Sequence, residues 1–451
     1  MEEQKAPSGE APKPAPKGKG LWIGIAVVVI VVAVLLAAVF AGVFNPPAVS
    51  EDKILRIGTV LTLTGTSGLE VFGPKNQRGA LLAIEEINAA GGVLDRPIAV
   101  VNEDDTGVDS VARDRAQKLV TTNKVDAILG AVGSGKCAAA LEVTKPNQVV
   151  QISASCTSPV FSDLTYTGGW FFRTAPSDAL QGVVAANYAY TNRSLRTMAV
   201  IGNNNPYGRG LANVFAVKFA ALGGTITHVG TFAEGAVSYS SDLQTLLTPL
   251  PEAVYMAEYP TDGLKIMRDW AANSAWSSVQ WIFSEGVLEQ AGFIDKLVQQ
   301  GIDPAPFQGS APGAYLGIVG SLYDGFEARY KARYSNEDPG LFTANAYDAI
   351  YLLAAAAEKA GTATAAGIAA FIRAVATPPG STFTGGQWAQ IKAAIAAGGD
   401  INYEGASGAV NLDALGDPLS GYAIWGIDAL DKITTLELFD EATVVRLISG
   451  S

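Results

Sequence analysis

The fold class of this chain is decided by three consecutive stretches, ILRIGTVL (54–61), NQRGALLAIEEINAAGG (76–92) and PIAVVNED (97–104). The first and third are short apolar runs that are typical of buried strands. The middle stretch repeats apolar residues at helical spacing and ends in two glycines, which commonly follow a helix. A strand, a helix and a second strand in this order predict a parallel β-α-β unit.

The same alternation continues along the chain in two series. The first adds a helix at 109–123 that opens on Asp109 as its cap, strands at 125–130 and 148–153, and a helix at 136–145 between them. The second has helices at 178–192, 210–224, 240–248 and 263–274 and strands at 196–202, 225–232, 252–259 and 279–286. Two such series predict an α/β protein with two doubly wound lobes, each built on a parallel sheet.

The C-terminal third differs from these two series. Residues 309–313, GSAPG, are rich in Gly and Pro and are interpreted as a strand that crosses between the lobes. Long helices are expected at 321–335 and 343–360, followed by a β-rich tail from about 408.

Composition limits the function classes. The chain has 451 residues, of which 49% are apolar, and this is enough for two lobes. Its formal net charge of −12 disfavours nucleic acid as a partner. With one histidine, His228, and no CxxC pair, the chain predicts neither a His-rich zinc site nor a Ser–His–Asp triad, and no cofactor is expected.

An uncharged apolar run, Leu21–Phe44, precedes the lobes. As a helix it would be about 36 Å long at about 1.5 Å per residue, enough to cross a membrane. Charged residues flank it: Lys13, Lys17 and Lys19 before it, Glu51 and Asp52 after it. The positive-inside rule then places a disordered tail, 1–20, in the cytoplasm.

We therefore expect a single-pass cell-membrane protein with an anchor at 21–45, a linker at 46–53 and an extracytoplasmic binding region. A cleaved signal peptide is the alternative, because Val39-Phe40-Ala41 resembles a cleavage site. The apolar run is longer than the roughly 7–15 residues of the apolar region within a signal peptide, which favours the anchor.

Seven motifs in order resemble the type I periplasmic binding proteins that serve branched-chain amino acid transporters, from about residue 54 to about 440. They are RIGTVLTLTG with FGPKNQRGALLAIEEINAAGGV, VNEDDTGVD, ISASCTSP, NNNPYGRGLA, FSEG, TANAYDAIYLLA and YEGASGAVNLDALGDP. The resemblance implies two Rossmann-like lobes joined by three crossing strands. It implies a first lobe at 54–172 and 312–418, and a second at 176–308 and 419–448.

The resemblance also implies that an amino-acid-like solute binds between the lobes and is delivered to ABC transporter permease subunits. Ser134 follows a strand at a helix start, where its hydroxyl and nearby N–H groups suit a carboxylate. Ser155, Cys156 and Thr157 lie in the next ligand loop of the family pattern. Glu285 matches the family's partner for the solute ammonium, a charge that is costly to bury alone.

The resemblance implies an aromatic wall around the solute's side chain, formed by Phe72, Tyr207 and Tyr259, and Phe342 is expected to join it from the start of the long C-terminal helix region. Each could instead be an ordinary core residue. Likewise, Ser134 and Thr157 could be helix-cap or loop hydroxyls, and Glu285 a solvated turn residue.

The sequence leaves alternatives open for Lys136 and for the two cysteines. Lys136 could contact an acidic group of the solute or lie in solvent. Gly130-x-x-x-x-Gly135-Lys136 is similar to a phosphate-binding P-loop, but Cys137 replaces the hydroxyl that binds magnesium, so an NTPase is disfavoured. A disulfide between Cys137 and Cys156 is possible, but spacing does not decide its geometry.

The sequence predicts no nucleophile–base constellation and hence no enzyme. A sensory ectodomain that signals through a partner is the alternative to transport. Leucine-like, polar and acidic amino acids, amides and urea-like compounds all remain open as solutes, as does the oligomeric state.

Overall fold

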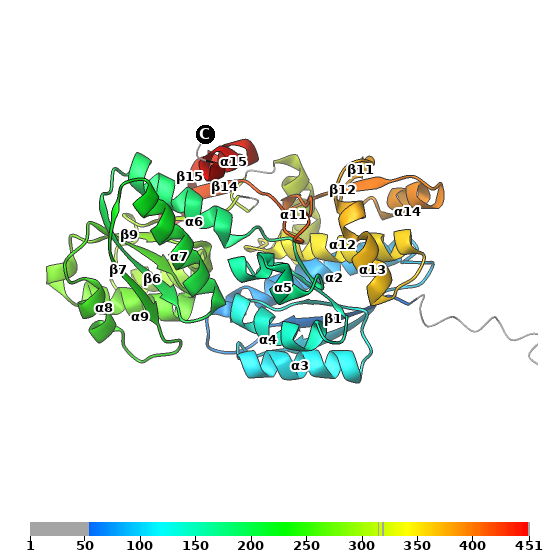
Figure 1. Cartoon of the computed structure of the whole chain (residues 1–451), viewed down its shortest axis with the longest axis horizontal. Coiled ribbons are helices and arrows are strands. Elements are labelled where there is room, and N and C mark those ends of the chain that lie inside the picture. Colours follow the sequence, from blue (N-terminus) through cyan, green and yellow to red (C-terminus); the bar gives the residue numbers. More distant parts are fainter. Residues whose placement is uncertain (1–53, 314, 318–319, 450–451) are drawn as a thin grey trace, which may run out of the picture. The chain divides into compact units, whose positions relative to one another are not determined.

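The computed structural model describes residues 54–313, 315–317 and 320–449, which fold around two main β-sheets (Figure 1). The predicted anchor Leu21–Phe44, the tail before it and the linker after it lie outside the described residues. Within the described part, no helix combines the length and apolar character needed to cross a membrane.

The first sheet has five parallel strands in the order β2-β1-β3-β4-β5. Their bounds are β1 Arg56–Leu61, β2 Ala99–Asp104, β3 Ala127–Gly130, β4 Val150–Ser153 and β5 Phe171–Arg173. Every residue of the central strands β3 and β4 is buried, as expected where helices cover both faces. We call this sheet and the helices packed on it the first lobe.

Helices of the first lobe lie on both faces of this sheet. They are α2 Gly73–Ala89, α3 Asp109–Thr121, α4 Ser134–Thr144, α11 Ser321–Arg333, α12 Thr343–Ala360, α13 Ala365–Ala376 and α14 Trp388–Ala396, with a short α5 Leu164–Thr167 before β5. The core on one face is formed largely by α2 and α12, which lie side by side (Figure 1). The core on the other face is formed by α3 and α4. Helices α13 and α14 were not predicted from the sequence.

The helix starts differ from the expected ones in two places. Helix α2 begins at Gly73, earlier than expected, because Pro74 fits the first helical turn, where its missing N–H has no partner to lose. Helix α3 has Val108 at its N-cap and no side-chain cap, so the predicted capping role of Asp109 is wrong. The Asp109 carboxylate forms an ion pair with Lys136 instead.

The second sheet has seven strands in the order β15-β14-β10-β9-β8-β6-β7. They are β6 Thr197–Asn203, β7 Thr225–Phe232, β8 Ala253–Ala257, β9 Gln280–Phe283, β10 Gln308–Pro312, β14 Tyr422–Ile427 and β15 Ile433–Phe439. Strands β6 to β10 are parallel, but β14 pairs antiparallel with both β10 and β15. The sheet is therefore mixed, whereas the sequence analysis predicted a parallel one.

This second sheet and its helices form what we call the second lobe. The helices are α6 Asp178–Asn187, α7 Pro206–Ala221, α8 Ser240–Leu246, α9 Pro260–Ala271, α10 Asp295–Gln299 and α15 Glu441–Ser449. Helix α15 ends the tail that was expected to be β-rich throughout. Within the described residues the chain passes between the two sheets after β5, after β10 and before β14.

The return path to β14 is attached to the first lobe by a buried carboxylate. A small sheet of β11 Ser381–Phe383, β12 Ile401–Gly405 and β13 Gly408–Ala409 lies in this region. Asp348 of α12 accepts hydrogen bonds from the Tyr403 hydroxyl (2.8 Å) and from the N–H groups of Ala406 (3.0 Å) and Ser407 (2.7 Å). Burial raises the pKa of Asp348 to about 6.

A disulfide joins Cys137 in α4 to Cys156 in the loop after β4, with an S–S distance of 1.98 Å. Both residues are fully buried. The bond links the first turn of α4 to the loop in which Ser155 and Thr157 lie.

Replacing Cys137 and Cys156 together by alanine should lower the free energy of unfolding by about 3 kcal/mol, because the bond closes a loop with a sequence separation of 19 residues. Urea unfolding of the parent and the double variant measures this difference. Thiol titration of the denatured parent should detect cysteine only after reduction. Free thiols before reduction would contradict the disulfide.

Candidate functional site

A cavity lies between the two lobes at the carboxyl ends of their strands, where open α/β sheets bind ligands. Its lining residues come from both sides: Leu69, Phe72, Val132, Gly133, Ser155, Thr157, Tyr207, Tyr259, Glu285, Gly286, Leu341 and Phe342. All residues that the sequence analysis selected for the ligand site are among them except Ser134 and Cys156.

The cavity is small. The space open to the centre of a water molecule is about 20 Å³, and a single water needs at least about 10–15 Å³ by the same measure. An amino acid does not fit into this space as it stands. Entry of such a solute therefore requires the lobes to separate or the lining side chains to move.

Glu285 is the acidic group of the cavity. It lies directly after β9, in the short helix Glu285–Val287, and is 2% exposed. One carboxylate oxygen accepts a 2.5 Å hydrogen bond from Gln181 of α6, which also donates to the Ser310 carbonyl (3.1 Å). Burial raises the pKa of Glu285 to about 7, although the hydrogen bond from Gln181 acts in the opposite direction.

A second buried carboxylate, Asp178, lies close to Glu285. It occupies the first turn of α6, is fully buried, and has the Thr157 hydroxyl beside its carboxyl group. Burial and then the charge of Glu285 raise its pKa well above the ordinary value. Two carboxyl groups in this environment favour a cation nearby.

Sequence reasoning missed Asp178 because it marks the start of the predicted helix at 178–192. An acidic residue there is ordinarily explained by the helix dipole. The apolar lining residues Leu69, Val132 and Leu341 were also missed, because an apolar residue in a loop carries no signal of the cavity it faces.

On the first lobe, the hydroxyl residues lie in the loop after β4. Ser155 and Thr157 line the cavity and are 8% and 1% exposed. The Thr157 carbonyl accepts a 2.8 Å hydrogen bond from the Asp178 N–H, which links the loop to α6 of the second lobe.

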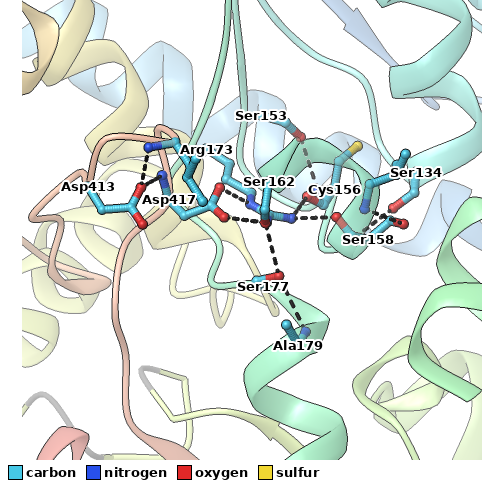
Figure 2. Close-up of polar contacts among 12 residues, drawn as sticks. Ser134, Ser153, Cys156, Ser158, Ser162, Arg173, Ser177, Ala179, Asp413 and Asp417 are labelled. Atoms are coloured by element: carbon cyan, nitrogen blue, oxygen red, sulfur yellow. Dashed lines mark hydrogen bonds and ion pairs between the residues drawn. The ribbon is translucent and has the colours of Figure 1, made fainter. Parts of the chain in front are cut away.

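Arg173, at the end of β5, positions this loop (Figure 2). It is fully buried and donates to the carbonyls of Cys156 (3.1 Å) and Ser158 (2.9 Å). Its Nε and second terminal nitrogen donate to the two oxygens of Asp417, at 2.7 and 2.8 Å. Asp417 lies on the return path to β14, and its N–H donates to Asp413 (3.0 Å).

Ser134 and Cys156 occupy positions behind the cavity wall. The Ser134 hydroxyl accepts a 3.2 Å hydrogen bond from the Ser158 N–H, so it braces the same loop from the start of α4 (Figure 2). The Cys156 sulfur is bonded to Cys137. The side chains of Ser134 and Cys156 therefore lie outside the cavity lining.

The aromatic residues form much of the remaining wall. The rings of Tyr207 and Tyr259 stack with centroids 5.2 Å apart, and the Tyr207 hydroxyl lies 2.6 Å from the Ser284 hydroxyl. Gly133 approaches Tyr259 so closely that a Cβ there would lie 3.0 Å from the tyrosine oxygen. Phe342 has a φ of 65°, which is unfavourable for a bulky residue and often accompanies a functional site.

Lys136 does not lie in solvent, which was one of the two roles considered from the sequence. Its side chain is 1% exposed, and its Nζ lies 3.3 Å from Asp109 and 3.7 Å from Glu234 of the second lobe. Lys136 is therefore a buried, ion-paired residue that does not line the central cavity.

Replacing Arg173 by lysine should lower the free energy of unfolding by about 3 kcal/mol, because Asp417 would remain buried without its two-point partner. Urea unfolding measures the change. Arg333→Lys is the matched control, since Arg333 makes the same two-point contact with Glu85 on the surface (2.7 and 2.9 Å) and should change stability by less than about 1 kcal/mol. Equal losses in both variants would contradict the role of Arg173.

Known proteins with similar sequences share this architecture. A family model described as periplasmic binding protein matches residues 54–397. The chain is 28% identical over 379 residues to the chemotactic signal transduction system substrate-binding protein BasB of Halobacterium salinarum, covering 82% of this chain and 86% of that protein. It is 30% identical over 343 residues to Leu/Ile/Val-binding protein homolog 1 of Brucella abortus, covering 73% and 83%.

Solved structures show the same fold. The leucine-binding protein LivK of Thermotoga maritima superposes with a TM-score of 0.72 at 23% identity, covering 86% of this chain and 99% of that one. The substrate-binding protein LivJ of Streptococcus pneumoniae, solved with isoleucine, has a TM-score of 0.67 at 24% identity, covering 85% and 99%. The chain therefore belongs to the type I periplasmic binding protein family, within the group that contains the Leu/Ile/Val-binding proteins.

Proposed function

We propose that this protein is an extracytoplasmic receptor that captures an amino acid between its lobes by hinge closure and delivers it to an ABC transporter permease. One observation carries the proposal: Ser155 and Thr157 of one lobe line the same cavity as Glu285 of the other. Hydroxyls opposite a carboxylate suit a zwitterion that carries both charges. The family is one of solute-binding receptors and not of enzymes.

In this proposal the solute first binds the loop of Ser155 and Thr157 through its carboxylate. Closure then brings Glu285 to its ammonium group, with Asp178 close behind. Phe72, Tyr207, Tyr259 and Phe342, together with Leu69, Val132 and Leu341, surround its side chain. This apolar wall supports a branched-chain or similar solute. Because the ligand contacts both lobes only when they meet, it stabilises the closed form.

The proposed lobe boundaries are 54–172 with 312–418, and 176–308 with 419–448. We also propose that Leu21–Phe44 anchors the protein in the cell membrane as a single span, with the binding region outside. The permease would then meet a receptor that stays close to the membrane. Protease treatment of intact cells tests this topology, since the lobes should be digested while an N-terminal tag is protected.

A sensory role is the second candidate, and one observation favours it. BasB of Halobacterium salinarum, which is 28% identical, is named as a component of a chemotactic signal transduction system. The binding step is common to both roles. Co-purification with a permease or with a signalling protein would distinguish them.

Replacing Glu285 by glutamine should weaken the binding of L-leucine at least tenfold, because the buried ammonium would lose a charged partner worth about 2 kcal/mol. Titration calorimetry at pH 8 measures the affinity, after a thermal-shift screen over amino acids has verified the best ligand. Asp242→Asn, which changes an exposed carboxylate of the same lobe, should leave the affinity unchanged. Unaltered affinity in Glu285→Gln would remove Glu285 from the site.

The affinity should also depend on pH. Burial raises the pKa of Glu285 to about 7, so the carboxyl group is ionised above about pH 7 and protonated below it. Lowering the pH from 7 to 5 should therefore weaken binding by up to about tenfold per pH unit, as protonation removes the partner of the ammonium. Calorimetry across this range should give a shallower profile for Glu285→Gln than for the parent, with Asp178 as the remaining buried carboxyl group, and a flat profile for the parent would refute the assignment.

A further inference from the structure

The buried cation Lys136 joins the two lobes beside the proposed binding cavity. It lies in the first turn of α4, and its side chain is only 1% exposed. Its Nζ is 3.3 Å from Asp109, which starts α3 of the first lobe. It is also 3.7 Å from Glu234, which follows β7 of the second lobe. The contact with Glu234 exists only while the lobes are together.

The interface around this ion pair is acidic. A second cavity of about 190 Å³ lies there, between residues 66–67 and 106–108 of the first lobe and Asn203, Glu234, Tyr259 and Asp262 of the second. Behind it, Glu258 is 1% exposed and has the side chain of Asn203 beside its carboxyl group. Burial, followed by the charge of Asp262 and then by a contribution from Glu234, raises the pKa of Glu258 well above its usual value.

The first lobe presents carboxylates to the same interface. Besides Asp109, it has the buried Asp105, which accepts a 2.6 Å hydrogen bond from Thr62 while its other oxygen has no partner in the described structure. Burial raises the pKa of Asp105, and the charge of Lys136 opposes this rise. Closing the lobes therefore brings acidic groups toward one another, and such like charges repel at short range.

The ion pair is also connected to the proposed ligand cavity. Glu234 accepts a 2.7 Å hydrogen bond from the side chain of Asn205, which caps α7 by accepting from the Gly208 N–H (3.1 Å). Tyr207 lies in this same first turn and lines the ligand cavity. Tyr259 lines both cavities.

We infer that Lys136 is a positioning residue for solute capture: it neutralises the acidic interface and pairs with Glu234, so that the lobes can close. This inference rests on the proposed function only in taking lobe closure as the step that captures the solute. The Lys136–Glu234 ion pair stabilises only the closed form, because opening of the lobes separates the two residues. A second pair across the lobes, Lys75 with Glu289 at 3.4 Å, means that loss of Lys136 should weaken closure without abolishing it.

The test measures the distance between the lobes directly. Spin labels are attached to cysteines introduced at Gln117 of α3 and Val217 of α7, both of which are exposed. Pulsed electron spin resonance then gives the distance distribution with and without L-leucine. The variants are Lys136→Met, which keeps the apolar stem, Glu234→Gln, and the two together. Arg113→Gln is the control, since its exposed ion pair with Glu142 lies within the first lobe.

We expect Lys136→Met and Glu234→Gln each to reduce the short-distance population and to raise the leucine concentration for half-closure about fivefold or more. The double variant should resemble the stronger single one, because both substitutions remove the same contact. Arg113→Gln should match the parent. If Lys136→Met does not fold, Glu234→Gln alone tests the inference. Glu234 is partly exposed, so its substitution should leave the fold intact.

Distances and half-closure concentrations within twofold of the parent in both single variants would overturn the inference, as would strictly additive effects in the double variant. Failure of the amino-acid proposal would give a different experimental result. In that case L-leucine and the other amino acids leave the parent's distances unchanged, while the ligand-free comparison of the parent with Lys136→Met still tests the ion pair.

Discussion

The geometry of the cleft depends on the two-point ion pair between Arg173 and Asp417. Arg173 ends the first sheet, Asp417 lies on the return path to the second, and the same guanidinium donates to two carbonyls of the loop that contains Thr157. The fully buried side chain of Arg173 thus holds both the loop of Thr157 and the return path that connects the two lobes. The burial of Arg173 makes a matching carboxylate obligatory, since a lone buried charge is costly.

Buried carboxyl groups give the cleft its chemical character. Glu285 lines the central cavity with Asp178 close to it, while Glu258 and Asp105 lie near the second cavity. Desolvation raises the pKa of each of these groups, so each gains from a nearby cation. In our proposals the solute ammonium provides that cation at one place and Lys136 provides it at the other. Solute capture and lobe closure would then both depend on a cation that meets buried carboxyl groups.

Much of the fold could be predicted because most strands and helices have a recognisable pattern of apolar residues in their own segment of sequence. Buried parallel strands such as 127–130 and 150–153 are short apolar runs, and amphipathic spacing marks the helices between them. The antiparallel pairing of β14 with β10 could not be predicted in this way, since a strand's own residues do not specify the direction of a neighbour distant in the chain. Helices α13 and α14 were also missed. The helix α15, which ends the described chain, was not predicted either.

The sequence by itself determined the α/β class, the alternation of elements, and the cluster of polar residues after strands, because parallel sheets bring their carboxyl ends to one edge. Only the tertiary structure decided which of those residues face the cavity. It turned Ser134 toward the loop backbone, bonded Cys156 to Cys137, brought Asp178 close to Glu285, and paired Lys136 with Glu234. The physical reason is that these outcomes depend on side-chain direction and on contacts between segments far apart in the chain, and neither has a local signature.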